Sequence, residues 1–279
     1  MPFFRRGAGG PVGLGWGRWL RIDRGWTENT FRGRPVTRGT ERFFPNPLER
    51  PSVLRAELHV HSALSYDGRD PVDLILEQAA AVGLDALAIT DHDEIDASLE
   101  AAELAPDFGL VGIPGMEVTS AAGHVLALGV RETIPAELPF TATIEAIHDR
   151  DGIAIVPHPF QASRSGVAAN IRRADLARAD AIEVYNSRLL TGRGNRQARR
   201  FAEEHGLPMT AGSDAHISEM VGQAVTLIDA PERSLPSILE AIRDGRTVVD
   251  GRRTPWHISF RQAAGGAKRR VKNRLRDVF

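Results

Sequence analysis

Cysteine is absent from this chain of 279 residues, which excludes disulfide bonds and any metal site built on thiolates. A metal would have to be bound by nitrogen and oxygen ligands. No apolar run approaches the roughly 20 residues that span a bilayer, and the amino-terminal segment lacks a continuous apolar stretch ending in a small-residue cleavage site. These absences predict a soluble, cytoplasmic protein without membrane attachment.

Neither positive nor negative charge predominates in the chain. The 35 basic and 36 acidic residues leave a formal charge of −1, which gives no electrostatic reason for the whole protein to bind nucleic acid or a membrane surface. Aromatic residues make up only 6% of the chain, whereas apolar residues make up 42%. The length and apolar content suffice for one large α/β domain with appendages.

The composition changes twice along the chain. Residues 1–52 are rich in Gly, Arg and Pro without a helical or strand period, which indicates an irregular N-terminal extension. Residues 53–250 form the predicted main domain. Residues 251–279 form a basic C-terminal tail, either a solvated basic helix or a contact for RNA, anionic lipid or an acidic neighbour.

Short β-rich runs alternate with helical stretches in the main domain. The predicted strands are Arg55–Val60, Ala86–Thr90, Leu110–Ile113, Val125–Gly129, Ile153–Val156, Ala181–Tyr185, Pro208–Ala211 and Ala224–Ile228. The predicted helices are 71–83, Ile95–Leu104, 141–152, Asn195–His205 and Leu235–Arg243. This alternation is typical of βαβ units and a largely parallel sheet, and it favours a barrel over an antiparallel sandwich.

Most of the polar motifs stand at or just beyond the carboxyl end of a predicted strand. These residues are His59, His61, Asp91, His92, Glu117, His158, Asn186, Asp214 and His216, while His124 opens its own strand. In a parallel barrel all these ends lie on one rim, so the side chains converge there. Because clustered carboxylates repel and buried imidazoles need partners, the convergence predicts divalent cations.

Spacing supports the same prediction. His59 and His61 are separated by one residue, so in a strand both side chains project to the same face, and Asp214 and His216 repeat this spacing. Asp91 is either a hydrogen-bond partner of a ligand imidazole or a helix N-cap. On sequence alone, Asp67 is equally an ordinary turn residue and His124 an ordinary strand residue.

Three further histidines are left out of the predicted site. His148 and His205 fall within predicted amphipathic helices, where a solvated or capping histidine is the commoner case, and His257 lies in the irregular C-terminal region.

An ordered series of motifs extends from Glu57 to Asp250: ELHVHSALSYDG, AITDHDEID, GMEVTS, GHVLALGV, IVPHPF, IEVYNS and AGSDAH. Together they resemble the PHP (polymerase and histidinol phosphatase) superfamily, and in particular its small stand-alone hydrolases. The resemblance implies an α/β fold, a distorted (β/α)7 TIM-like barrel with a metal cluster at the C-terminal rim of its strands.

The resemblance also implies how the ligands are grouped. His59, His61, Glu117 and Asp214 would bind one metal; Glu117, His124 and His158 a second; Asp67, His92 and His216 a third. Glu57 stands where Asp is frequent in the family, at a supporting position.

The predicted activity is hydrolysis of a phosphoester in a small metabolite or nucleotide by a metal-activated hydroxide. Three divalent ions against three carboxylates would leave a charge of about +3, which favours anionic phosphate oxygens. Asp214 is the predicted proton acceptor, and His216 or Asp91 the predicted donor to the leaving group. Arg164 and Arg188, with Asn186, are the predicted substrate-binding residues.

Two rival functions stay open. Some PHP relatives resemble the CehA/McbA group, which implies hydrolysis of carbamate or amide-type aromatic compounds, although few aromatic residues lie near the rim motifs. The other rival is a non-catalytic domain stabilised by metal. The ligand types suit Zn, Mn and Fe, in two or three copies, and the sequence predicts neither the physiological substrate nor the oligomeric state.

Overall fold

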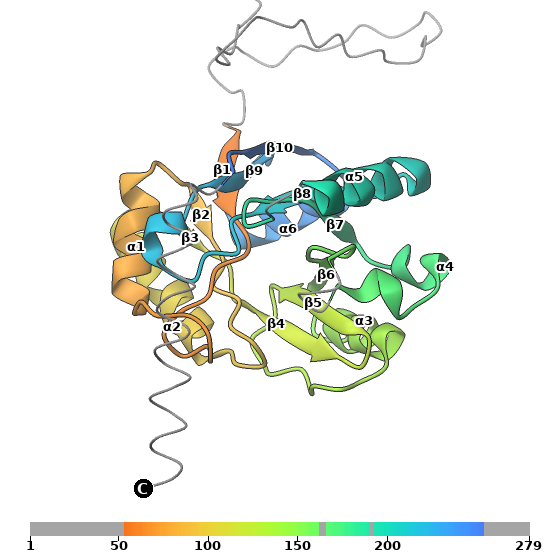
Figure 1. Ribbon diagram of the computed structural model, residues 1–279. Helices are drawn as coiled ribbons and strands as arrows, with labels where there is room; N and C mark the ends of the chain where they lie inside the picture. The colour runs from red at the N-terminus through yellow and green to blue at the C-terminus, as the bar shows by residue number, and fades with distance from the viewer. Residues whose placement is uncertain (1–52, 162–165, 190–191, 254–279) are drawn as a thin grey trace, which may run out of the picture. The chain divides into compact units, whose positions relative to one another are not determined.

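A computed structural model describes residues 53–161, 166–189 and 192–253 (Figure 1). Arg164, the extension 1–52 and the tail beyond Arg253 lie outside the described residues, as does His257. The domain boundaries at 52 and 250 therefore stay predictions. None of the helices in the described part is long and apolar enough to cross a membrane.

Helices and strands alternate through most of this part. The strands are β1 (Leu54–Glu57), β2 (Ala86–Leu87), β3 (Val111–Gly112), β4 (Gly115–Ser120), β5 (Gly123–Leu128), β6 (Ile153–Val156), β7 (Ala181–Asn186), β8 (Met209–Gly212), β9 (Ala224–Ile228) and β10 (Thr247–Gly251). The helices are α1 (Val72–Ala81), α2 (Asp96–Leu104), α3 (Phe140–His148), α4 (Arg173–Leu176), α5 (Arg193–His205) and α6 (Leu235–Arg243). Short 3-10 turns occur at Ala105–Phe108, Val167–Ala169 and Ser218–Met220.

The strands pair in two five-stranded sheets. Their orders are β10-β9-β1-β2-β3 and β4-β5-β6-β7-β8. Pairing is parallel from β1 through β2 to β3 and from β6 through β7 to β8, but β5 is antiparallel to both neighbours and β9 is antiparallel to β1 and β10. The predicted mixed α/β class is confirmed, with more antiparallel pairing than the sequence predicted.

Two isolated parallel bridges join the sheets beyond the ends of their strands. Val60 pairs with Ala215, which links the extension of β1 to that of β8, and His92 pairs with Glu117, which links the extension of β2 to β4. Within the described residues these bridges are single pairs rather than a continuous ladder, so a closed barrel stays a prediction. The second bridge joins two predicted metal ligands, and the first lies between the predicted ligands on either side of Val60 and of Ala215, so both bridges hold the two halves of the rim together.

Apolar side chains at the amino ends of the strands form a core to which both sheets contribute. Leu54, Ile153 and Ala181 are at most 2% exposed there, and Ile238 and Ile242 of α6 pack against them. Separate apolar clusters lie between the first sheet and α1 and α2, and between the second sheet and α3 and α5. Burial on both faces explains why the strands are nearly continuous apolar runs.

Strands β4 and β10 were not predicted. In β4 the run GMEVTS contains a glycine and a glutamate and is buried on nearly all positions, so it lacks the alternation that marks a half-exposed strand. In β10 the residues alternate only between exposed and half-buried positions. The hydrophobic pattern is therefore too weak to predict a strand from the sequence. The five predicted helices all occur, with ends within a few residues of those expected.

Candidate metal centre

The strands place the predicted ligands at one edge of the molecule. His59 and His61 follow β1, His92 follows β2, and Glu117 lies within β4. The bridge between His92 and Glu117 is fixed by two backbone hydrogen bonds, Glu117 N–H to Asp91 O at 3.0 Å and Asp93 N–H to Glu117 O at 3.0 Å. Ligands from three strands therefore share one level of the rim.

His124 reaches the rim because β5 runs antiparallel. It pairs with Thr119 near the carboxyl end of β4, so the beginning of β5 lies where the other strands end. The direction of β5 could not be predicted from the sequence, because local patterns place His124 at the start of a strand but do not set the orientation of that strand.

His158 and Asp214 have left-handed backbone conformations, with φ of 31° and 52°. Non-glycine residues adopt this region rarely, and such strain gathers at functional sites. Gly212 shows how tightly the strand before Asp214 packs, since a Cβ there would approach the Cβ of His59 to 2.6 Å.

Glu117 is the centre of the cluster. Its Oε1 lies 2.8 Å from His124 Nδ1 and 3.6 Å from His158 Nε2. Its Oε2 lies 3.2 Å from the Nε2 atoms of both His59 and His61 and 3.5 Å from His92 Nδ1. Five imidazoles thus surround one carboxylate that is 1% exposed.

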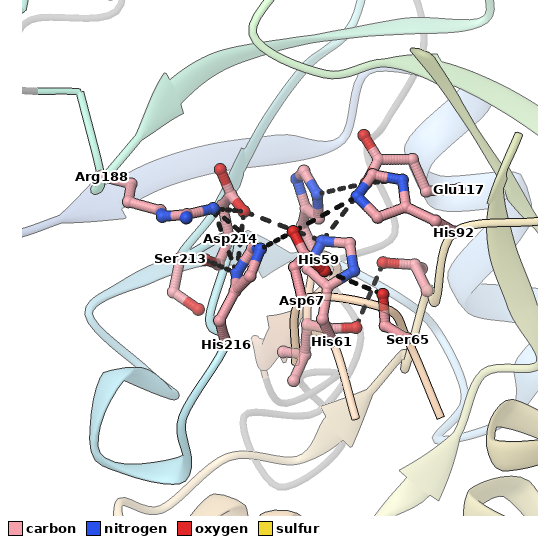
Figure 2. Close-up of polar contacts among 12 residues, drawn as sticks. His59, His61, Ser65, Asp67, His92, Glu117, Arg188, Ser213, Asp214 and His216 are labelled. Carbon is pink, nitrogen blue, oxygen red and sulfur yellow. Dashed lines mark hydrogen bonds and ion pairs between the residues drawn. The ribbon is translucent and has the colours of Figure 1, made fainter. Parts of the chain in front are cut away.

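A second group gathers around His216 and Asp214 (Figure 2). His216 Nε2 lies 2.6 Å from Asp67 Oδ2, and its Nδ1 lies 3.3 Å from Asp214 Oδ1. The guanidinium of Arg188 lies 2.8 Å from the same Asp214 oxygen and 2.9 Å from His216 Nε2. A positively charged group therefore already lies between a carboxylate and an imidazole.

Several buried polar atoms in the cluster make no well-directed hydrogen bond among the described residues, although some lie close to a neighbouring imidazole or carboxylate. They are both ring nitrogens of His61, Nδ1 of His92, Nδ1 of His158 and Oε1 of Glu117. Such atoms cost free energy unless something satisfies them, and a divalent cation accepts lone pairs from nitrogen and oxygen at once. These side chains fit a metal centre.

The predicted ligands fall into overlapping groups whose ligand atoms lie within 4.8 Å of one another. The groups are His59–His158–Asp214, His59–His61–Glu117, His61–Asp214–His216, His61–Asp67–His92 and His92–Glu117–His124. All nine predicted ligands appear in at least one group, and the overlap suits more than one ion.

Below the cluster lies a layer of residues whose carboxylates are fully bonded. Glu183 accepts hydrogen bonds from His59 Nδ1 at 3.0 Å, from the His158 backbone N–H at 2.9 Å and from Asn186 Nδ2 at 3.0 Å. Glu57 accepts from the backbone N–H of Ser213 at 2.9 Å and of Gly222 at 3.1 Å. These contacts hold the loops that carry His158 and Asp214.

Sequence reasoning missed Glu183, although it lies in the run IEVYNS that carried the resemblance. One of the two sequence predictions for Asp91 was instead that its carboxylate accepts a hydrogen bond from a ligand imidazole. Within the described structure Asp91 bonds Ser62, whose backbone N–H lies 2.6 Å away and whose hydroxyl donates to the other oxygen. Asp91 therefore fixes the loop after His61, and Glu183 orients the His59 ring.

The electrostatics of His61 and Glu117 match the protonation states that metal ligands need, whereas the pKa of His59, lowered by burial, is raised well above its usual range by the Glu117 and Glu183 carboxylates. Burial, with the neighbouring His216 imidazole, lowers the pKa of His61 to about 3, so its imidazole is neutral. Burial alone would raise the pKa of Glu117, but the surrounding histidines, His59 first, hold that pKa well below its usual range. Metals bind neutral imidazole and ionised carboxylate, so both groups are prepared for a cation.

The remaining predicted residues divide clearly. Asn186 and Arg188 lie beside the cluster, since Asn186 Nδ2 donates to Asp214 Oδ2 at 3.3 Å and Arg188 contacts the other oxygen. His148 and His205 stay outside it, bonded instead to Asp180 and to the Phe201 carbonyl. Arg164 is outside the described residues.

Comparison with known proteins gives two family matches. A model described as PHP domain matches residues 57–192, and a model described as PHP-associated matches residues 192–247. The uncharacterized protein MJ1587 of Methanocaldococcus jannaschii is 33% identical over 144 residues, which are 48% of this chain and 82% of that protein.

Two further relatives are informative. A phosphoribosyl 1,2-cyclic phosphate 1,2-diphosphodiesterase from Eggerthella lenta is 41% identical over 86 residues, 29% of this chain and 32% of the enzyme. The crystal structure of a two-domain protein from Bacteroides vulgatus, which contains a predicted PHP-like metal-dependent phosphoesterase, superposes with a TM-score of 0.62 at 23% identity. The superposition covers 77% of this chain and 70% of that one, and it shows a shared fold.

Proposed function

Because this chain belongs to the PHP domain family, we propose that it is a metal-dependent phosphoesterase acting on a small phosphorylated metabolite or nucleotide. The observation that carries the proposal is the buried cluster of six histidines and three carboxylates around Glu117, with the Arg188 guanidinium at its side. Phosphodiester cleavage by the relative from Eggerthella lenta supports the same class of reaction.

The proposed cofactor is a set of two or three divalent ions, of Zn, Mn or Fe. They would be held by the nine residues of the cluster. When bound, such ions supply Lewis-acid stabilisation of a phosphoryl group and lower the pKa of a water. With three ions the centre would carry a charge of about +3, which favours an anionic substrate over a neutral one.

Arg188 is the proposed contact for a non-bridging phosphate oxygen. Its guanidinium is held beside Asp214 and His216, and its backbone N–H donates to Asn186 Oδ1 at 3.0 Å, which fixes the turn that carries it. Guanidinium groups bind phosphate through charge-assisted, often paired, hydrogen bonds.

Asp214 is the proposed proton acceptor for the attacking water. Asn186 donates to one of its oxygens and Arg188 to the other, so the carboxylate is oriented from two sides. Its φ of 52° lies in the left-handed region, which is strained for a non-glycine residue and is typical of functional sites. Burial, with the charge of Arg188, lowers the pKa of His216, which suits a neutral ligand better than a proton donor.

One observation favours a second candidate, hydrolysis of a carbamate or amide on an aromatic compound. The ring of Tyr66 is 71% exposed and stacks on His92 at a centroid distance of 4.7 Å, and Leu64 in the same loop is 57% exposed. Few aromatic residues lie near the rim motifs in the sequence, yet this loop places a flat ring against His92 at the edge of the cluster.

Measuring turnover on matched substrates separates the two. We expect the protein loaded with Mn or Zn to release phosphate from phosphomonoesters or nucleoside bisphosphates, and to leave an aryl carbamate intact. His59→Ala should abolish phosphate release, whereas His148→Ala, which changes a surface histidine of α3, should retain it. Turnover of the carbamate alone would move the assignment to the second candidate.

A further inference from the structure

A pocket of about 230 Å³ lies between the end of β7, the beginning of α5 and the segment after β10. Three guanidinium groups line it, those of Arg196, Arg199 and Arg253, together with the Tyr185 ring and Asn195. None of the nine side chains of the metal cluster belongs to this lining. The pocket is therefore a separate concentration of positive charge.

Two of the arginines converge on Gly192, the residue that precedes α5. A Cβ at Gly192 would lie 3.6 Å from Arg196 Nη1 and 3.9 Å from Arg253 Nη2. Arg199 follows Arg196 by one helical turn and lies on the same face of α5. The three charges thus come from two segments far apart in the sequence.

No ion pair joins these three arginines to a carboxylate within the described part of the chain, whereas several other surface arginines are paired. Arg172 pairs with Asp175 at 2.8 Å, Arg173 with Glu204 at 3.3 Å and Arg178 with Glu145 at 3.0 Å. Like charges gathered without a carboxylate repel one another, and an anion between them removes that repulsion.

The topology places this pocket at the same end of the sheets as the metal cluster. β10 is antiparallel to β9, and β9 is antiparallel to β1, so β10 runs parallel to β1. Arg253, just beyond the end of β10, therefore lies toward the edge where His59 and His61 follow β1. α5 also begins at this edge, because it follows β7.

Asn195 connects the pocket wall to the cluster. Its Nδ2 donates to the Asn186 carbonyl at 3.0 Å, and its Oδ1 accepts from the Asn186 backbone N–H at 3.2 Å. The Asn186 side chain in turn contacts Asp214. The pocket and the cluster are neighbours with one residue, Asn186, in contact with both.

We propose that this pocket binds the phosphate group of a small phosphorylated molecule, at a site distinct from the metal centre. Guanidinium groups match phosphate geometry through paired hydrogen bonds, and clusters of arginines are a common means of recognising phosphate. The volume is below the roughly 300–1,000 Å³ of pockets for drug-sized ligands, which fits a sugar phosphate or a free phosphate ion. Tyr185 supplies an apolar wall for the carbon part of such a ligand.

Calorimetric titration of the full-length protein with ribose 5-phosphate, and separately with inorganic phosphate, tests this. We expect binding in the wild type and in His59→Ala, because the pocket does not use the metal ligands. Made in the His59→Ala background, so that the metal centre does not contribute, the double variant Arg196→Gln/Arg253→Gln should bind at least ten times more weakly than His59→Ala alone. Arg172→Gln, which removes one positive charge from an exposed site elsewhere, should bind as the wild type does.

If ribose 5-phosphate binds more tightly than inorganic phosphate, the ligand is a phosphorylated organic molecule. If inorganic phosphate binds as tightly or more tightly, the ligand is the free phosphate ion. The changed arginines are exposed, so a circular dichroism melt should match that of the wild type and exclude misfolding. Undiminished affinity in the double variant, or binding lost in His59→Ala, would overturn the proposal.

Discussion

The two ends of the same strands are occupied by opposite kinds of side chain. At the amino ends, Leu54, Ile153 and Ala181 pack with α6 into an apolar core. At the carboxyl ends, the same strands lead into His59, His158 and Asn186, and several buried atoms there make no well-directed hydrogen bond among the described residues. One end therefore supplies stability, and the other carries the side chains of the proposed metal centre.

Two buried carboxylates near the carboxyl ends differ in their surroundings. Glu57 and Glu117 are both buried, yet their pKa values move in opposite directions. Burial raises the pKa of Glu57 to about 7, whereas the histidines around Glu117 hold its pKa well below the usual range. The difference shows that surrounding charge, rather than burial, decides which carboxylate is prepared to bind a cation.

The largest expected effect follows from neutralising Glu117. Glu117→Gln keeps the size of the side chain but removes the charge that five imidazoles face, so the ions should be lost. Because Lewis-acid stabilisation contributes several kcal/mol, phosphate release should fall on the order of 10³-fold or more. Steady-state assays with Glu145→Gln, an exposed change on α3, as the control would test this, and a loss under tenfold would contradict it.

Truncating the apolar end should act on stability instead. Ile155→Ala removes a fully buried side chain of β6 that packs in the shared core, and the free energy of unfolding should fall by about 3 kcal/mol. Urea unfolding measures the loss, and elemental analysis of the folded variant should find an unchanged metal content. A variant that folds but loses its metal would show that the two ends are not independent.

Glu57 should make the stability of the metal-free protein depend on pH. Its folded pKa of about 7 lies above the usual value of 4.5, so the folded state holds the proton more tightly. The resulting stabilisation is present below pH 4.5 and is lost as pH rises to about 7, a change of about 3 kcal/mol. Glu57→Gln lacks this titration.

Urea unfolding of both proteins between pH 5 and pH 8 isolates the effect, because the other titrating groups are common to them. The advantage of the wild type relative to Glu57→Gln should shrink as pH rises. A constant difference across that range would show that Glu57 titrates with an ordinary pKa.

A smaller effect is expected from Glu183, which orients a ligand without belonging to the cluster. Glu183→Gln replaces the acceptor of the His59 ring proton by a weaker one, and such supporting partners typically contribute 10- to 100-fold in metal affinity. Competition with a chelator measures that affinity. Loss of all metal binding would mean that Glu183 is itself a ligand.

The sequence predicted most residues of the cluster from local patterns, whereas Asp67 and His124 depended on the family resemblance. Strand-end positions and the spacing of His59 with His61 and of Asp214 with His216 depend only on local periodicity, and the structure brings all nine predicted residues together. The α/β class follows from the same periodicity. The left-handed conformations of His158 and Asp214 left no local trace, because neither residue is glycine.

Features that depend on tertiary pairing could not be predicted. The direction of β5, which carries His124 to the rim, is fixed by its antiparallel pairing with β4, a strand whose buried sequence has no clear period. The partnership of Glu183 with His59 joins residues 124 positions apart. The convergence of Arg196 and Arg253 likewise requires that β10 lie beside β7, which local patterns do not specify.

Counting the metal ions bound per chain tests the central claim most directly. Elemental analysis of protein purified with Mn or Zn should find two or three ions per wild-type chain, and fewer in His61→Ala, which removes two buried ring nitrogens that make no well-directed hydrogen bond in the described structure. His148→Ala should keep the wild-type content. A wild-type protein without bound ions, or a His61→Ala variant with undiminished content, would contradict the assignment of this cluster as a multi-metal centre.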